Sequence, residues 1–357
     1  MNKRIILLLS LCSLMVSACN GPSESPKTEK PAEAAAKPAG FRIYVTNENS
    51  GDVSVIDSNT NDVVATVTVG KRPRGIHVSP DRKTVYVALS GTPIAGPNAD
   101  PKVKQPPSNK TADGIGVVDA AQNKMVKMIP GGSDPEEFSL SQDGSLLYIS
   151  NEDDAAAGIL DIASNKLVAS LKVGKEPEGV ATSPDGKYVW VTSEDAGTVS
   201  VIDTAARKVI KTIMIGSRPR KVAFLPDGSK AFVTRENDGK FSVVDTAKLA
   251  VTGEVELGKA GEIKPMGMVV SSDGSKLYVS TGRGKKVFVV DTAANKVDAS
   301  FEVGERPWGI GLSPDGKFLY TANGPSNDVS VVDLSTNMVI KRIKVGDKPW
   351  GIAVVAP

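Results

Sequence analysis

Residues 303–317 read VGERPWGIGLSPDGK, and altered forms of this stretch recur along almost the whole chain. Its proline is one of seven that are separated by 62, 42, 42, 46, 42 and 42 residues: Pro73, Pro135, Pro177, Pro219, Pro265, Pro307 and Pro349. A fixed period of about 40–45 residues that holds four short strands is typical of a β-propeller blade. The sequence therefore predicts an all-β fold, a seven-bladed β-propeller with four-stranded blades.

The strands of one blade follow from alternation and turn residues. In the copy after Pro177 they are expected at 179–182, 187–192, 198–203 and 208–215. The repeat begins at 41–47 with a second strand of a blade and ends at 351–355 with a first strand. We therefore expect the C-terminal strand to complete the blade whose other three strands come from residues 41–70. This closes the ring and removes open sheet edges.

Two side chains recur in every copy, which indicates that each blade needs them. The second strand carries an aromatic residue, at Tyr44, Tyr86, Tyr148, Trp190, Phe232, Tyr278 and Tyr320. The third strand ends in an aspartate, at Asp57, Asp119, Asp161, Asp203, Asp245, Asp291 and Asp333. We predict that the aromatic residues pack between blades and that the aspartates accept backbone hydrogen bonds in the following turn.

The N-terminal 40 residues differ from the repeat. Residues 1–18 have a charged start, a short apolar run and small residues before Cys19, which is typical of a lipoprotein signal peptide; a plain signal peptide is the alternative. Cys19 is then the lipidated end of a disordered Pro/Ala-rich tether, 19–40, and the propeller is 41–357 with an insertion at about 90–110. This predicts secretion across the inner membrane and a lipid anchor, in the outer membrane facing the periplasm or at the cell surface.

Composition restricts the chemistry. The formal net charge of +2 falls to zero once Lys3 and Arg4 are removed with the signal, so the basicity typical of nucleic-acid binding is absent. His77 is the one histidine of the sequence, which excludes a multi-histidine metal site. It lies in the first strand of its blade, and we interpret it as a tolerated polar residue. No nucleophile elbow, P-loop or dinucleotide fingerprint is present. We expect no catalytic residue, no metal and no cofactor.

The seven copies of the repeat differ most in sequence on one face of the predicted propeller. The residue after each proline should ring the mouth of the central channel, and these residues are Arg74, Glu136, Glu178, Arg220, Met266, Trp308 and Trp350. One position further on, Glu137 and Lys221 replace a recurring glycine. Because Trp and Arg are enriched in binding hot spots, the ring is predicted to bind a partner. A possible acidic docking patch lies in the neighbouring loops, at Glu152, Asp153, Asp154, Glu194 and Asp195.

Residues 44–47 (YVTN), 54–57 (SVID) and 183–186 (SPDG) resemble the YVTN family of β-propeller repeats, over 41–357. More narrowly, 134–138 (DPEEF), 151–154 (NEDD), 323–329 (NGPSNDV) and 349–351 (PWG) resemble the β-propeller proteins associated with PQQ-dependent catabolism. The resemblance implies that the protein acts in the periplasm as a partner of the quinoproteins that oxidise alcohols.

Three functions remain open at this point. The first is a non-enzymatic, membrane-tethered monomer that binds a periplasmic or cell-surface protein or a small ligand, accessory to quinoprotein- or cytochrome-linked alcohol oxidation. The second is a propeller hydrolase or lactonase that uses the channel-mouth carboxylates Glu136 and Glu178. The third is a surface adhesion module. The sequence favours the first.

Overall fold

The computed structural model describes residues 40–94 and 107–357. The predicted signal peptide, Cys19, most of the predicted tether and the middle of the insertion lie outside these residues. Within the described ranges, no helix combines the length and apolar character needed to cross a membrane. The same described residues contain two short 3₁₀ helices, η1 (Lys110–Ala112) and η2 (Glu236–Asp238).

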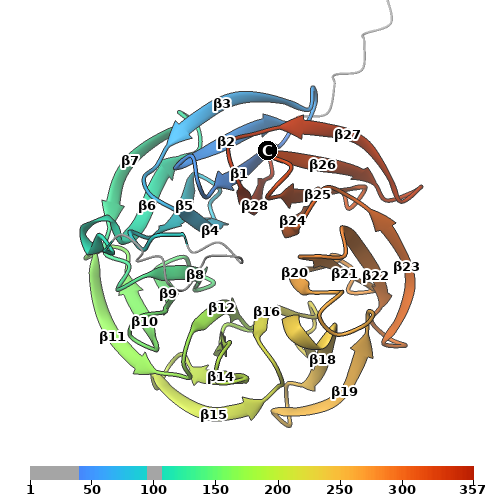
Figure 1. Ribbon diagram of the computed structural model, residues 1–357. Coiled ribbons are helices and arrows are strands. Elements are labelled where there is room, and N and C mark those ends of the chain that lie inside the picture. The colour runs from blue at the N-terminus through green and yellow to red at the C-terminus, as the bar shows by residue number, and fades with distance from the viewer. Residues whose placement is uncertain (1–39, 95–106) are drawn as a thin grey trace, which may run out of the picture. The chain divides into compact units, whose positions relative to one another are not determined.

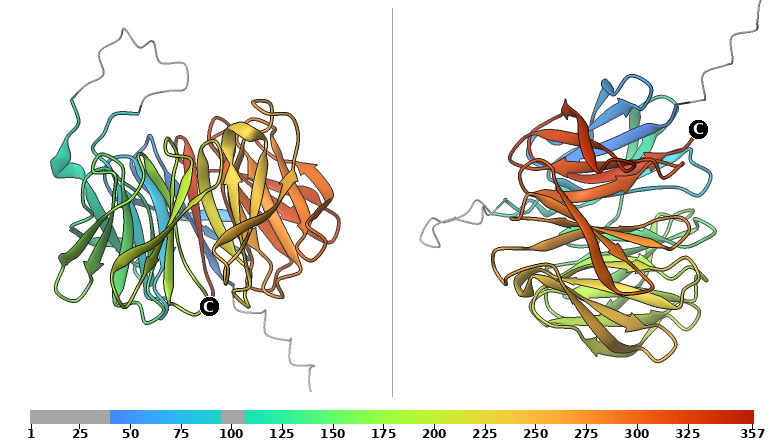
Figure 2. Two further views of the ribbon diagram at one scale, coloured as in Figure 1. Left: turned by 90° about the horizontal axis from the view of Figure 1, so that it is seen from below. Right: turned by 90° about the vertical axis from the view of Figure 1, so that its right-hand side faces the viewer.

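The described chain forms seven antiparallel sheets of four strands that are arranged in a ring, which confirms the predicted fold (Figures 1 and 2). The first three blades are β28 (Pro349–Val355), β1 (Arg42–Asn47), β2 (Asp52–Asp57) and β3 (Asp62–Thr68); β4 (Pro73–Val78), β5 (Thr84–Leu89), β6 (Gly114–Asp119) and β7 (Lys124–Ile129); and β8 (Pro135–Leu140), β9 (Leu146–Asn151), β10 (Ala156–Asp161) and β11 (Lys166–Lys172).

The other four blades repeat the same order from the channel outward. They are β12 (Pro177–Thr182), β13 (Tyr188–Ser193), β14 (Thr198–Asp203) and β15 (Lys208–Met214); β16 (Pro219–Phe224), β17 (Lys230–Arg235), β18 (Lys240–Asp245) and β19 (Ala250–Glu256); β20 (Pro265–Val270), β21 (Lys276–Thr281), β22 (Lys286–Asp291) and β23 (Lys296–Glu302); and β24 (Pro307–Leu312), β25 (Phe318–Asn323), β26 (Asp328–Asp333) and β27 (Met338–Lys344).

The recurring side chains have their predicted roles. Tyr44 of β1 is fully buried, and its hydroxyl donates to Ala120 O (3.0 Å) and Asn123 Oδ1 (2.7 Å) of the next blade. Asp119 accepts the backbone N–H groups of Ala121 (2.9 Å) and Gln122 (2.8 Å). The aspartates that end the other six third strands accept equivalent bonds in the following turn. These residues recur because they build the blade.

The ring is closed as the sequence predicts. β28 pairs with β1 in antiparallel register, with Tyr44 opposite Ala353 and Ile43 opposite Val354. β1 in turn pairs with β2. The two ends of the repeat are therefore held together by the hydrogen bonds of a single sheet.

Deleting residues 349–357 should open the ring. The deletion removes β28, so β1 is left with an unpaired edge that invites pairing between molecules. We expect the shortened chain to aggregate and to lose its single cooperative thermal transition, as measured by light scattering and circular dichroism. A monomeric product with an unchanged melting temperature would contradict this role of β28.

The innermost strands approach one another closely around the channel. A Cβ atom on Gly309 would lie 2.5 Å from Trp350 O, and one on Gly351 would lie 2.5 Å from Arg74 O. The backbone of the next blade thus explains the glycine that recurs at this position. Glu137 in β8 and Lys221 in β16 carry full side chains there, so these two blades depart from the rule at a crowded point.

Candidate functional site

The inner strands line two neighbouring cavities. The outer cavity has a volume of about 820 Å³ and the inner one about 400 Å³. Five residues line both cavities, and we call the level of the channel at which they lie the constriction: Glu178, Arg220, Met266, Trp308 and Trp350. All five belong to the predicted ring. Arg74 lines the outer cavity only.

Glu136 is the ring residue that departs from its expected position. It is fully buried and lines neither cavity. Its carboxylate forms ion pairs with Arg72 (3.3 Å) and with Arg74. The arginines of β4 hold this carboxylate inside the wall, so Glu136 cannot act on a ligand in the channel.

The two tryptophans of the predicted ring are half-buried in the channel wall. The ring centroids of Trp308 and Trp350 are 5.8 Å apart. The Arg74 guanidinium lies 5.5 Å from the Trp350 ring, and that of Arg220 lies 5.7 Å from the Trp308 ring. Cation–π attraction therefore holds the tryptophans against the arginines at the constriction.

The acidic residues of the predicted docking patch do not share one surface. Asp153, Asp154 and Asp195 are exposed, Glu152 is half-buried and Glu194 is buried. Glu194 turns inward because Arg218 and Arg220 pair with it; its Oε1 lies 2.9 Å from Arg220 Nη2.

A group of carboxylates near the outer cavity does not fit a metal. Oxygen atoms of Asp134, Glu136 and Glu152 come within 4.8 Å of one another. Arg72 lies 3.3 Å from both Asp134 and Glu136. A cation would have to displace these ion pairs, so the arginines already balance the negative charge.

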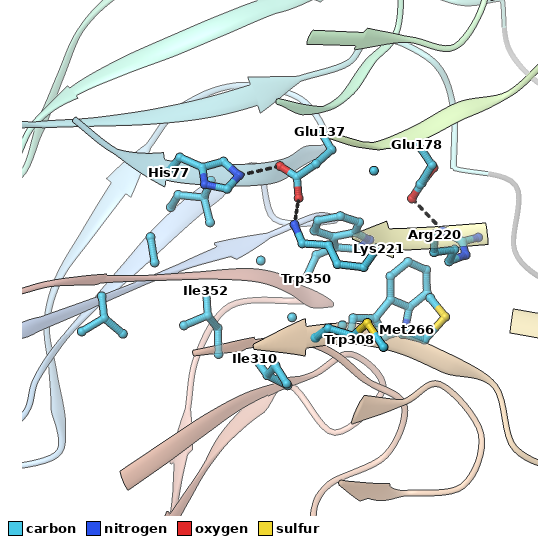
Figure 3. Close-up of a pocket in the computed structure, with 18 of the residues that line it drawn as sticks. His77, Glu137, Glu178, Arg220, Lys221, Met266, Trp308, Ile310, Trp350 and Ile352 are labelled. Carbon is cyan, nitrogen blue, oxygen red and sulfur yellow. Dashed lines mark hydrogen bonds and ion pairs between the residues drawn. The ribbon is translucent and has the colours of Figure 1, made fainter. Parts of the chain in front are cut away.

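The inner cavity brings together three polar residues from three blades. The Nε2 atom of His77 in β4 lies 2.9 Å from Glu137 Oε1 in β8. Lys221 in β16 donates from Nζ to Glu137 Oε2 over 2.7 Å (Figure 3). All three line the inner cavity, and we call them the channel triad.

Each member of the channel triad breaks the repeat. Glu137 and Lys221 replace the recurring glycine, and His77 stands where the other blades carry Ser139, Ala181, Ala223, Val269, Gly311 and Ala353. The three departures are visible in the sequence, but none of the three residues was predicted to belong to a site. The interpretation of His77 as a tolerated polar residue missed its partner, because His77 and Glu137 meet only when neighbouring inner strands pack together.

Glu137 is the buried centre of the triad. Burial alone would raise its pKa, but the charges and hydrogen bonds of Lys221 and His77 outweigh burial and lower the pKa from 4.5 to about 2. Phe138 N also donates to Glu137 Oε1 (3.0 Å). The Glu137 side chain is 6% exposed, whereas that of His77 is 33% exposed. A buried carboxylate therefore orients an imidazole and an ammonium group that a ligand can reach.

The low pKa values predict acid lability. Burial would also raise the pKa of Glu236. Arg220 and Lys264 outweigh burial and lower this pKa to about 2. A pKa below its unfolded value of 4.5 adds stability that is present above pH 4.5 and is lost as the pH falls towards 2. The free energy of unfolding should fall over this window, by an amount on the order of 3 kcal/mol for each carboxylate. Urea titrations at several pH values measure it, and a Glu137→Gln variant with the wild-type pH dependence would contradict the assignment to Glu137.

Two family models match parts of the chain. Residues 180–345 match the model described as lactonase, 7-bladed beta-propeller. Residues 109–222 match the model described as cytochrome D1 heme domain. The chain is thus a seven-bladed β-propeller that is similar to the lactonase model over one part of its length and to the cytochrome D1 model over another.

Solved structures share the fold at low sequence identity. Hydrazine synthase of Kuenenia stuttgartiensis has a TM-score of 0.71 and 24% identity, over 82% of this chain and 92% of the other. The periplasmic gluconolactonase PpgL of Pseudomonas aeruginosa has a TM-score of 0.69 and 21% identity, over 89% and 99%. A putative 6-phosphogluconolactonase of Bacteroides fragilis has a TM-score of 0.72 and 17% identity, over 91% and 100%.

Among curated proteins, a PE-PGRS family protein of Mycobacterium tuberculosis is 50% identical over 50 residues, which are 14% of this chain and 11% of that protein.

These comparisons correct the sequence-based function. The prediction of a non-enzymatic binding scaffold is wrong, because residues 180–345 match the lactonase model. They favour the enzyme alternative, a lactonase. The segment that matches the cytochrome D1 model contains no histidine that could serve as an axial haem ligand, and the one histidine of the sequence, His77, lies outside that segment and bonds through Nε2 to Glu137.

Proposed function

We propose that this propeller is a lactone hydrolase whose active site is the channel triad. The observation that supports the proposal most strongly is the convergence of His77, Glu137 and Lys221, three departures from the repeat, on one point of the inner cavity. Nothing in the blade requires these residues, because the other copies form the same sheets without them. The lactonase match supports the reaction class.

The hydrogen bonds suggest a role for each residue. An ionised Glu137 can only accept hydrogen bonds, so the Nε2 atom of His77 carries a proton and Nδ1 keeps a lone pair. Nδ1 takes a proton from a water molecule as the water oxygen attacks the lactone carbonyl carbon. Glu137 fixes the tautomer and stabilises the imidazolium that forms, as the acidic residue of a hydrolytic triad does.

Lys221 completes the reaction. Its ammonium group has three donors, of which Glu137 accepts one, so the others can stabilise the oxyanion of the tetrahedral intermediate. When the intermediate collapses, the bond between the carbonyl carbon and the ring oxygen breaks. His77 returns its proton to the departing alkoxide, and the product is the open hydroxy acid, which ionises and releases one proton to solvent.

Proton release tests the proposal. The full chain is mixed with δ-valerolactone, γ-butyrolactone, δ-decanolactone and D-glucono-δ-lactone in weak buffer with a pH indicator. We expect at least one lactone to open faster than in buffer alone and with saturable kinetics. Spontaneous rates for every lactone would refute the proposed function.

We further propose that the enzyme works outside the inner membrane, held by lipidated Cys19 and the tether 19–40, as the signal-like segment 1–18 suggests. The likeness to propellers associated with PQQ-dependent catabolism fits the same compartment. Oxidation of a cyclic hemiacetal yields a lactone, so a lactonase beside a quinoprotein alcohol oxidation would consume its product. Palmitate labelling of the wild type and of Cys19→Ala tests the anchor, and equal labelling of both would exclude it.

A further inference from the structure

The inner cavity has a polar wall and an apolar wall. His77, Glu137 and Lys221 lie on one side, and Ile310 and Ile352 lie on the other (Figure 3). The apolar wall comes from four inner strands, β20, β24, β28 and β4, which contribute Met268, Ile310, Ile352, Val354, Ile76 and Val78. A ligand bound to the triad would thus extend over aliphatic side chains.

The other charged residues of this cavity are paired at its outer end. Arg220 Nη1 donates to Glu178 Oε1 over 2.7 Å, and both residues belong to the constriction. Arg220 also pairs with Glu194 and Glu236. Its donors are therefore engaged by carboxylates at the outer end of the cavity, and the side chains of the described apolar wall itself are aliphatic or thioether groups.

Such a cavity discriminates between classes of lactone. A sugar lactone carries hydroxyl groups around its ring, and a hydroxyl group that is moved from water to an apolar wall loses its hydrogen bonds at a net cost. An alkyl substituent gains from the same wall, by roughly four-fold in affinity for each buried methylene group. A volume of about 400 Å³ lies in the usual range for small-molecule pockets.

We propose that the substrate is a lactone with an apolar alkyl substituent, bound with its carbonyl at His77 and Lys221 and its chain against Ile310 and Ile352. This inference rests on the proposed lactone hydrolase. It goes beyond that function because it excludes polyhydroxylated lactones as the preferred substrates.

A homologous series tests the substrate class. Values of kcat/KM are measured for the full chain with δ-hexanolactone, δ-octanolactone, δ-decanolactone and D-glucono-δ-lactone. We expect kcat/KM to rise along the alkyl series and to be at least ten-fold lower for the sugar lactone than for δ-decanolactone. Hydrolysis of the sugar lactone as fast as that of δ-decanolactone would overturn this inference and leave the lactonase proposal standing. Absence of hydrolysis for all four would overturn both.

A variant of the apolar wall gives an independent readout. Ile352→Asn should raise KM for δ-decanolactone about ten-fold with a much smaller change for δ-hexanolactone, and Ile352→Val should restore the wild-type value. Ile340→Asn changes a 54% exposed isoleucine on β27, outside the channel, and should leave both KM values unchanged. Equal changes in KM for the long and short lactones in Ile352→Asn would overturn the alkyl assignment.

Discussion

Replacing His77 with alanine is expected to lower kcat/KM for lactone hydrolysis by a factor of about 10²–10⁴, the usual contribution of a general base. The imidazole is the only group of the channel triad with a lone pair free to take a proton, since Glu137 is bound by both partners at a pKa of about 2. The side chain is 33% exposed and lies at the cavity surface, so its removal should leave the blade intact.

Ser139→Ala is the matched control for His77→Ala. Ser139 occupies the corresponding position one blade further on and does not line the inner cavity. We expect wild-type kcat/KM for this control and unchanged far-ultraviolet circular dichroism for both variants. A His77→Ala enzyme that keeps its activity would show that another group removes the proton.

Replacing Arg220 with methionine is expected to destabilise the propeller by about 3–5 kcal/mol, the cost of leaving buried charge without its partner. Arg220 pairs with three carboxylates, Glu178 (2.7 Å), Glu194 (2.9 Å) and Glu236 (2.6 Å). Methionine fills similar space but supplies no donor. The three carboxylates would then repel one another at the constriction, with Arg218 and Lys264 as their remaining cations.

The comparison for Arg220→Met is Arg42→Met. Arg42 pairs with Asp57 at 2.7 Å, but its side chain is 38% exposed, and exposed ion pairs contribute about 0–1 kcal/mol. Urea unfolding monitored by tryptophan fluorescence and circular dichroism should separate the two variants clearly. Equal losses in the free energy of unfolding would show that the buried ion pairs of Arg220 stabilise the propeller no more than the exposed pair of Arg42 does.

The fold could be predicted because every blade is built with the same contacts, so the residues that make these contacts recur in the sequence. Tyr44 and Asp119 recur because every blade needs the same inter-blade contact and the same turn, and a requirement that each blade repeats is visible in the sequence. Strand bounds follow closely as well: the expected strand 208–215 is β15, Lys208–Met214. The closing pair β28 and β1 followed from the mismatch between the first and last strands of the repeat.

The site was harder to predict because it depends on long side chains. The ring residues were identified at the right end of the channel, but the sequence did not show that Arg74 holds Glu136 inside the wall or that Arg220 draws Glu194 inward. The channel triad forms one layer deeper, where Lys221 in β16 reaches Glu137 in β8. The sequence carried one indication of the channel triad: Glu137 and Lys221 replace a glycine that the close packing of the inner strands otherwise requires.

The most direct test of the central claim is a double-mutant cycle on lactone hydrolysis. The kcat/KM values of the wild type, His77→Ala, Lys221→Met and the double variant are measured by proton release with one lactone that the wild type opens. Residues that act as a unit give strongly non-additive losses. We predict that each single variant loses most of the activity and that the double variant is little worse than either. Full additivity of two small losses, or a wild type no faster than the uncatalysed reaction, would contradict a lactonase site at His77, Glu137 and Lys221.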